Sequence, residues 1–180
     1  MKKSIGPQTL LYPHPVLVIG TYGADGRPNL MTASWGGICC SKPPCVAVSM
    51  RKATLTHSNI RANRAFTVNI PSVSHVKEAD YVGMASGHDT DKFKAAGLTP
   101  VRSEKVNAPY VEDFPLSLEC KLIIETEVGS HTQFILDDKG QPLIEKVRPF
   151  IYASGGNRSY HAIGDMIAEA FSVGQALKPK

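Results

Sequence analysis

The sequence predicts one mainly β (α+β) domain over residues 1–180, an antiparallel, Greek-key-like barrel with short helical crossovers. Short segments with the spacing of strands follow one another closely and outnumber the segments with helical spacing. The helical segments interrupt the series of strands instead of alternating with them, which argues against a doubly wound parallel sheet. With 42% hydrophobic residues, the chain has enough apolar side chains for an ordinary core.

The first strands should form a hairpin. Residues 16–20 are a short apolar run, and the Asp25-Gly26 step that follows is a strong turn signal. Residues 27–34 would return as the second strand. After a glycine break and a proline turn, residues 46–50 are continuously apolar and predict a buried strand.

Three short helices are expected in the middle of the chain. The first covers residues 54–64 and begins at Thr54, a residue type that caps helices well. The second runs from Ser74 to residue 85. The third has Asp89 as its cap and ends at Gly97. Residues 65–70, between the first two helices, alternate as a strand.

The clearest strand is residues 116–128, in which the even-numbered residues from Leu116 to Val128 are expected to share one face. Residues 131–136 predict another strand and 137–140 a turn. Residues 148–152 begin the last section of the chain, followed by a loop rich in Gly and Ser over 153–164 and a helical pattern from residue 167.

Composition argues against several classes of protein. The net charge of +4 is mild and the basic residues are scattered, so nucleic acid is not an expected partner. Prolines interrupt the segment after the basic N-terminus, which does not read as a signal peptide. Because no stretch approaches ~18 apolar residues, we expect no membrane span and a cytoplasmic location.

Three of the four cysteines lie close together, at Cys39, Cys40 and Cys45, and the fourth is Cys120. Their spacing does not match a zinc site, so no metal is predicted. A metal or redox cluster stays an alternative. We favour reduced thiols that pack as small apolar residues.

The segment around Trp35, the only tryptophan, is the first candidate for a binding site. Small residues, among them Gly36 and Gly37, leave the main chain bare and allow a flat ligand to approach closely. The alternative interpretation is a bulged strand with a buried tryptophan.

The second candidate is a site for an anion. Arg51 follows a buried strand, and the helix after it begins with the hydroxyls of Thr54 and Thr56 beside exposed amides. Lys92 lies in the first turn of a helix, where a cation is unfavourable unless an anion binds nearby. Each cation alone could be an ordinary surface residue. Together with a flat-ring site they suggest a nucleotide-like ligand.

Several motifs occur in order: RPNLMTASWGGICCSKPPCVAVSMRKATLTHSNI, SGHDTDKF, EVGSHT and AFSVG. With them the chain resembles the flavoredoxin and flavin reductase-like family of FMN-binding split β-barrels. The resemblance implies a bound FMN, a homodimer with the cofactor near the subunit boundary, and a cofactor that carries the redox chemistry. It implies FMN contacts by Asn29, Met31, Thr32, Ala33, Ser34, Trp35, Cys40, Ser49, Met50, Arg51, Thr54, Thr56, Asp89 and Lys92.

The resemblance implies no indispensable acid or base. His131 is a candidate for a residue near the flavin that bonds a substrate or ring atom, and a histidine satisfied within its strand is the alternative. The family usually has a further strand after residues 130–135, whereas here Leu136 leads at once into the acidic turn. Either residues are deleted, which would shorten a barrel strand, or some are missing from the sequence as written.

Two activities fit the resemblance equally: an NAD(P)H:flavin oxidoreductase, and a flavoredoxin-type electron carrier served by a protein donor such as ferredoxin. No Rossmann glycine fingerprint is present, so a nicotinamide cofactor would bind without one. A flavin-storage protein without turnover is an alternative. A small β-barrel that binds an oligonucleotide is another, which the single tryptophan and dispersed charge argue against.

Overall fold

An eight-stranded antiparallel sheet forms the body of the molecule, in a computed structural model that describes residues 2–138, 143–144, 148–153 and 158–165. Its strand order is β3-β2-β6-β9-β10-β5-β4, with β11 paired to β9. The strands of this sheet are β2 (Leu17–Tyr22), β3 (Pro28–Ala33), β4 (Gly36–Ser41), β5 (Pro44–Arg51), β6 (Ala65–Ile70), β9 (Leu116–Val128), β10 (His131–Asp138) and β11 (Leu143–Ile144).

The remaining elements cover or extend this sheet. The helices are α1 (Leu55–Asn63), α2 (Val76–Met84) and α3 (Lys92–Ala96), with a 3-10 turn, η1 (Val73–His75), before α2. The small strands are β7 (Pro100–Arg102), β8 (Pro109–Val111), β1 (His14–Pro15), β12 (Phe150–Ala153) and β13 (Ser159–Ala162). The mainly β class with short helical insertions is therefore confirmed.

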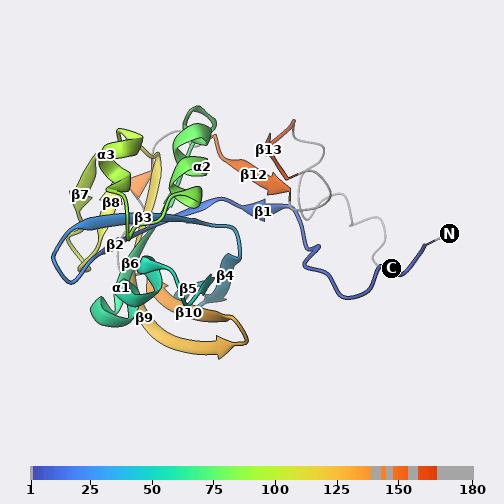
Figure 1. The fold of residues 1–180 in the computed structure, drawn as a ribbon, viewed down its shortest axis with the longest axis horizontal. Helices are drawn as coiled ribbons and strands as arrows, with labels where there is room; N and C mark the ends of the chain where they lie inside the picture. The colour runs from blue at the N-terminus through green and yellow to red at the C-terminus, as the bar shows by residue number, and fades with distance from the viewer. Residues whose placement is uncertain (1, 139–142, 145–147, 154–157, 166–180) are drawn as a thin grey trace, which may run out of the picture.

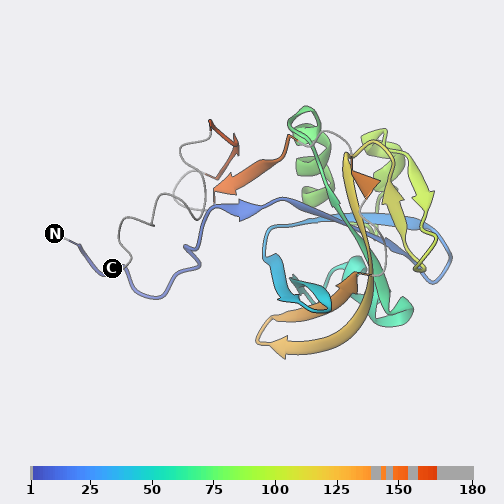
Figure 2. The same ribbon diagram turned by 180° about the vertical axis from the view of Figure 1, so that it is seen from behind.

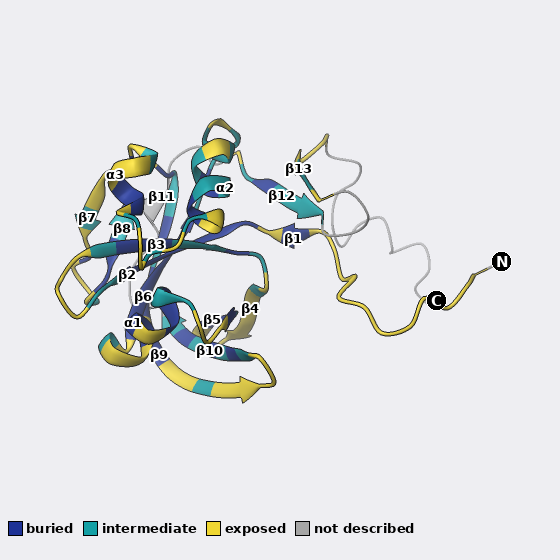
Figure 3. Ribbon diagram, viewed as in Figure 1, coloured by how far each residue is buried: buried dark blue, intermediate teal, exposed yellow. Residues whose placement is uncertain are grey.

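The large sheet curls so that β9, β10, β5 and β4 bend away from β2 and β3 (Figure 1). One apolar core fills the inside of this curl and contains Ile19, Val48, Phe66 and Phe134, all fully buried. A second core lies under α2 and α3, and Figure 3 shows the buried sides of these helices facing the sheet. Strand β3 contributes Ala33 to the first core and Leu30 to the second, so it is packed on both faces and its backbone is held in place.

A separate three-stranded sheet, β1-β12-β13, extends from the barrel, as the views from both sides show (Figures 1 and 2). The chain before β1 is exposed, with Leu11 at 84%. The described residues include no helix long and apolar enough to cross a membrane. The helical pattern expected from residue 167 lies outside the described residues.

Several expectations about single elements were wrong. The glycine break after Trp35 is strand β4, because its backbone pairs with β5 from Gly36 to Ser41. The third helix is capped by Asp91, whose side chain accepts a hydrogen bond from the Lys94 amide, and not by Asp89. Its end at Gly97 is confirmed, with φ at +67°.

The long strand β9 has the predicted bounds, but of its apolar face only Leu118, Cys120 and Leu122 pack in the core, and Ser117 and Glu119 on the polar face are buried as well. Cys120 and Leu122 are buried, whereas Ile124 and Val128 are 50% and 63% exposed. The register with β10 shifts between Ile135, opposite Ile124, and Leu136, opposite Leu122. This bulge, together with the bend of the sheet, carries the end of β9 away from the core.

The acidic stretch after Leu136 does not truncate β10. The strand continues to Asp138 and is paired with β5 from Arg51 to Cys45 as well as with β9. The predicted turn thus begins inside a strand, and residues 139–140 lie outside the described part of the chain. The barrel strand that begins at His131 is therefore paired with β5 from Arg51 to Cys45.

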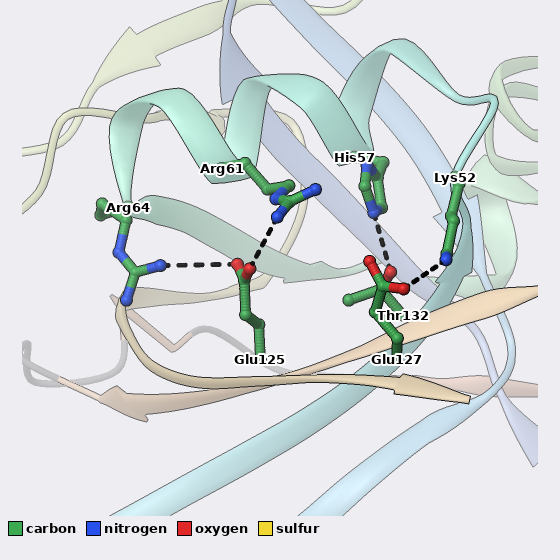
Figure 4. A network of polar contacts seen from close by, with 7 residues as sticks. All are labelled: Lys52, His57, Arg61, Arg64, Glu125, Glu127 and Thr132. Carbon is green, nitrogen blue, oxygen red and sulfur yellow. Dashed lines mark hydrogen bonds and ion pairs between the residues drawn. The ribbon is translucent and has the colours of Figure 1, made fainter.

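Helix α1 is tied to β9 and β10 by polar contacts along its length (Figure 4). Arg61 and Arg64 form ion pairs with Glu125 at 3.1 and 3.5 Å. Near the start of the helix, the buried His57 ring nitrogen Nε2 lies 2.9 Å from the Thr132 hydroxyl. These contacts fix the N-terminus of α1 relative to the barrel wall.

Candidate functional site

A cavity of about 630 Å³ lies where β3, β5, the start of α1 and the loop after α2 meet. Segments far apart in the sequence supply its walls, as the motifs predicted. The predicted cofactor residues that line it are Asn29, Met31, Thr32, Ala33, Ser34, Trp35, Ser49, Met50, Arg51, Thr54, Thr56 and Lys92. The candidate His131 lines it as well.

Trp35 stands at one side of this cavity. Its carbonyl accepts a hydrogen bond of 2.8 Å from the Ser49 amide, which joins the end of β3 to β5. Its ring is 40% exposed and lies 4.9 Å from the His131 ring, tilted by 31°. The alternative of a buried tryptophan is therefore wrong, and both rings offer flat surface to the cavity.

The start of α1 forms a second side. The Thr54 hydroxyl donates to the Arg51 carbonyl at 3.0 Å and accepts from the His57 amide at 3.3 Å. The turn from β5 into the helix is thus held closed, with Arg51 at its start. Amides at a helix N-terminus point outward and favour a negative charge, so this corner has the chemistry of an anion site.

Asn29 and Thr56 belong to a buried polar network in the cavity wall. The Asn29 side-chain amide donates to the Thr56 hydroxyl at 2.9 Å. A Cβ at Gly87 would lie only 2.2 Å from Asn29 Oδ1, so a larger residue there would force the Asn29 side chain to shift. Both predicted residues are at most 6% exposed, and their contacts fix β3 against α1 and this loop.

Lys92 is the first residue of α3 and is only 4% exposed. Its Nζ donates to the Val82 carbonyl at 2.8 Å, at the C-terminal turn of α2. Burial lowers the pKa of Lys92 from 10.5 to about 8. A buried ammonium at the edge of a cavity, with a neutral carbonyl as the described partner, is suited to an anion that would restore its charge.

The described residues that line the cavity include three cationic side chains, Arg51, Lys92 and Arg158, and no carboxylate. Sequence reasoning missed Arg158. The available signal was an arginine directly after a glycine-rich loop, but nothing in the sequence showed that Arg158, just before β13, lies at this cavity. Arg158 also lines a neighbouring cavity of about 420 Å³ that shares Ser34 and Met84 with this one.

The structure does not bring Cys40 or Asp89 to this cavity. Cys40 is exposed on β4, and its thiol donates to the Lys42 carbonyl at 3.5 Å. Asp89 lines a different cavity of about 750 Å³, on the far side of Leu55 and Gly87. Among the described residues, no three His, Cys, Asp or Glu side chains are placed to hold a metal ion.

Residues 9–160 match the model of the flavin reductase like domain. The chain belongs to the flavin reductase like family. Flavoredoxin of Desulfovibrio vulgaris (Miyazaki F) is 47% identical and superposes with a TM-score of 0.90, covering 97% of this chain and 100% of that protein.

Two relatives extend the comparison across the flavin reductase like family. A protein of Archaeoglobus fulgidus is 31% identical over 126 residues, which is 70% of this chain and 71% of the relative. The high molecular weight rubredoxin of Moorella thermoacetica is 32% identical over 115 residues, 63% of this chain and 49% of that protein. The cavity described above combines flat ring surfaces with an anion corner.

Proposed function

We propose that this chain is a flavoprotein that binds FMN in the cavity between β3, β5 and α1 and acts in electron transfer. The observation that carries the proposal is the convergence of Arg51 and Lys92, 41 positions apart in the sequence, on one cavity that also contains the exposed face of Trp35. Its similarity to a flavoredoxin and to a high molecular weight rubredoxin supports an electron-transfer role.

In this proposal, the protein holds the two ends of FMN by different means. Arg51, Lys92 and the first turn of α1 would bind the phosphate, whose two negative charges match the two cations. The backbone from Met31 in β3 to Ser34, just after the strand, would lie along the ring system and bond its polar edge. Burial of Lys92 strengthens its attraction to the phosphate, because little water screens the pair.

When bound, the flavin supplies the redox chemistry by accepting and passing on electrons or hydride. The residues of the chain place it and shield it from stray oxidants. His131 is held against Trp35 and by a contact of 2.9 Å between its Nδ1 and the Ser130 hydroxyl. That arrangement suits a residue that contacts a second substrate above the ring.

Adding FMN to the protein tests the binding step. We expect a shifted flavin absorption spectrum and quenched fluorescence, with saturation at one FMN per chain. Arg51→Gln should weaken binding about tenfold or more, since a hydrogen bond to a charged group contributes about 1.5–3 kcal/mol. The matched control is Arg102→Gln on β7, an exposed position outside the described lining. Protein that takes up no FMN would contradict the proposal.

Two kinds of electron donor remain candidates, and a storage role is the second candidate function. Reduction of the FMN-loaded protein by NADH, NADPH and reduced ferredoxin should be followed side by side in a stopped-flow spectrometer. Fast reduction by a nicotinamide identifies a flavin oxidoreductase, and fast reduction by ferredoxin identifies a carrier. The open cavity and the third cation, Arg158, favour turnover over storage, because they leave room and charge for a second, anionic reactant.

A further inference from the structure

The hairpin β4–β5 places two cysteines directly opposite each other. Ser41 pairs with Pro44 at the closed end of the hairpin, and Cys40 pairs with Cys45 in the next position. Opposed residues of antiparallel strands have Cα atoms about 4.5–5.5 Å apart and side chains on the same face. This separation falls within the range of about 4.4–6.8 Å that disulfides span.

Both thiols are already directed toward the same turn. The Cys40 thiol donates to the Lys42 carbonyl at 3.5 Å, and the Cys45 thiol donates to the Pro43 carbonyl at 3.4 Å. Burial raises the pKa of the Cys45 thiol, and the nearby Cys40 and Cys39 add to the rise. The Cys40 and Cys45 thiols therefore interact with each other in the reduced form.

The neighbouring Cys39 is not equivalent. The register shifts between Ile38, opposite Val46, and Cys40, opposite Cys45, so that Cys39 is the extra residue of a bulge. It has no paired residue of its own on β5. Cys120 is buried in the core on β9 and is distant from the hairpin in the strand order. The fold thus selects one pair among the four cysteines.

We propose that Cys40 and Cys45 form a reversible cross-strand disulfide and are a site of thiol–disulfide exchange. The oxidant is a low-molecular-weight disulfide, such as glutathione disulfide. The exposed Cys40 thiolate attacks one sulfur of the oxidant and releases one thiol. The buried Cys45 then attacks the Cys40 sulfur and displaces the second thiol. Two protein thiols lose two electrons and two protons, and two small thiols take them up.

This site lies on an element that shapes the flavin cavity. Strand β4 follows Trp35, and β5 ends with Ser49, Met50 and Arg51. A disulfide near the closed end would join β4 to β5, and neither of its cysteines lines the cavity. Formation of the disulfide is independent of flavin binding, so the two proposals can fail separately.

The full chain, kept free of metal ions by a chelator, should be incubated with glutathione disulfide. Thiols are then counted after denaturation, and non-reduced peptides are mapped by mass spectrometry. Wild-type protein should fall from four titratable thiols to two, with one linkage between Cys40 and Cys45, and dithiothreitol should restore all four.

Single variants separate this pair from the other cysteines. Cys39→Ser should still lose two thiols, from three to one. Cys45→Ser should stop at a glutathione adduct on Cys40, and Cys40→Ser should keep Cys45 as a thiol. Cys40 is exposed, so its replacement leaves the folded core intact. A linkage through Cys39, a bond between two chains, or a wild-type protein that keeps its glutathione adduct would overturn the proposal.

Discussion

At the scale of single residues, Lys92 is the cation whose protonation state should respond most to a bound ligand. It is almost completely buried, and the partner that the structure describes for it is a backbone carbonyl. Its lowered pKa of about 8 means that the free protein already loses this charge in mildly alkaline solution. A bound phosphate would favour the ammonium and raise the pKa again.

We predict that FMN affinity decreases as the pH rises above about 8. The free protein has the lower pKa and the complex the higher one, so binding takes up a proton between these two values and is progressively weakened there. Lys92→Gln should bind FMN about tenfold to a hundredfold more weakly at about pH 7. Its affinity should not change as the pH is raised to about 9. Fluorescence titrations across this range measure both effects.

Lys94→Gln is the control for this prediction, because Lys94 is an exposed lysine of the same helix. It should reproduce the affinity and the pH dependence of the unaltered protein. If Lys92→Gln kept the same pH dependence as the wild type, the titrating group would be another one, and the phosphate contact assigned to Lys92 would be wrong.

At the scale of elements, α1 joins the anion corner to the barrel wall through His57. The ring lies edge-on to Phe134 at 5.3 Å and bonds to Thr132, both on β10. Burial lowers the pKa of His57 below 6.5, with Arg61 acting in the same direction. The ring is therefore held neutral in the folded state.

We predict that the free energy of unfolding decreases as the pH falls below about 6.5. The unfolded chain then binds a proton at His57 that the folded chain does not, and this favours unfolding. His57→Gln should remove this part of the pH dependence and lower the stability at neutral pH by about 1 kcal/mol. Urea denaturation of both proteins at two pH values measures the free energy of unfolding and its pH dependence. His88→Gln, on an exposed loop, is the control and should retain the wild-type slope.

Elements defined by local patterns were predicted well, and those defined by distant pairing were not. Strand β6 has the predicted bounds and Thr54 caps α1, because apolar periodicity and capping chemistry are local signals. Strand β4 was missed because its glycines and exposed cysteines lack any apolar pattern; only pairing with β5 makes it a strand.

The candidate site shows the same division. Arg51 and Lys92 could be named because their motifs occur in order along the chain, and the fold brings them to one cavity. Arg158 could not be named, since it reaches the cavity through the small sheet formed by β1, β12 and β13. Asp89 and Asp91 both suit a helix cap by residue type, and only the geometry of α3 distinguishes them.

At the scale of the whole molecule, the outer side of the curled sheet carries an apolar row across four strands. Gly37, Ala47, Ile135 and Ile124 are paired one to the next across β4, β5, β10 and β9. Ile38, the next residue of the edge strand β4, pairs with Val46 and so points to the other face of the sheet, and it is 87% exposed. Exposed apolar surface at a sheet edge is typical of a protein contact, which agrees with the homodimer expected from the sequence.

We predict that the protein is a homodimer whose interface includes the edge strand β4 and its exposed Ile38. Ile38→Lys should shift it to monomers in light scattering and sedimentation, because a charge buried between two chains without a partner is unfavourable. The monomer should stay folded, since Ile38 contributes little to the core of one chain. Ala24→Lys, in the exposed turn between β2 and β3, adds the same charge elsewhere and should leave the dimer intact. A protein that is monomeric before any substitution, or an Ile38→Lys variant that stays dimeric at low concentration, would show that these two chains do not meet through β4.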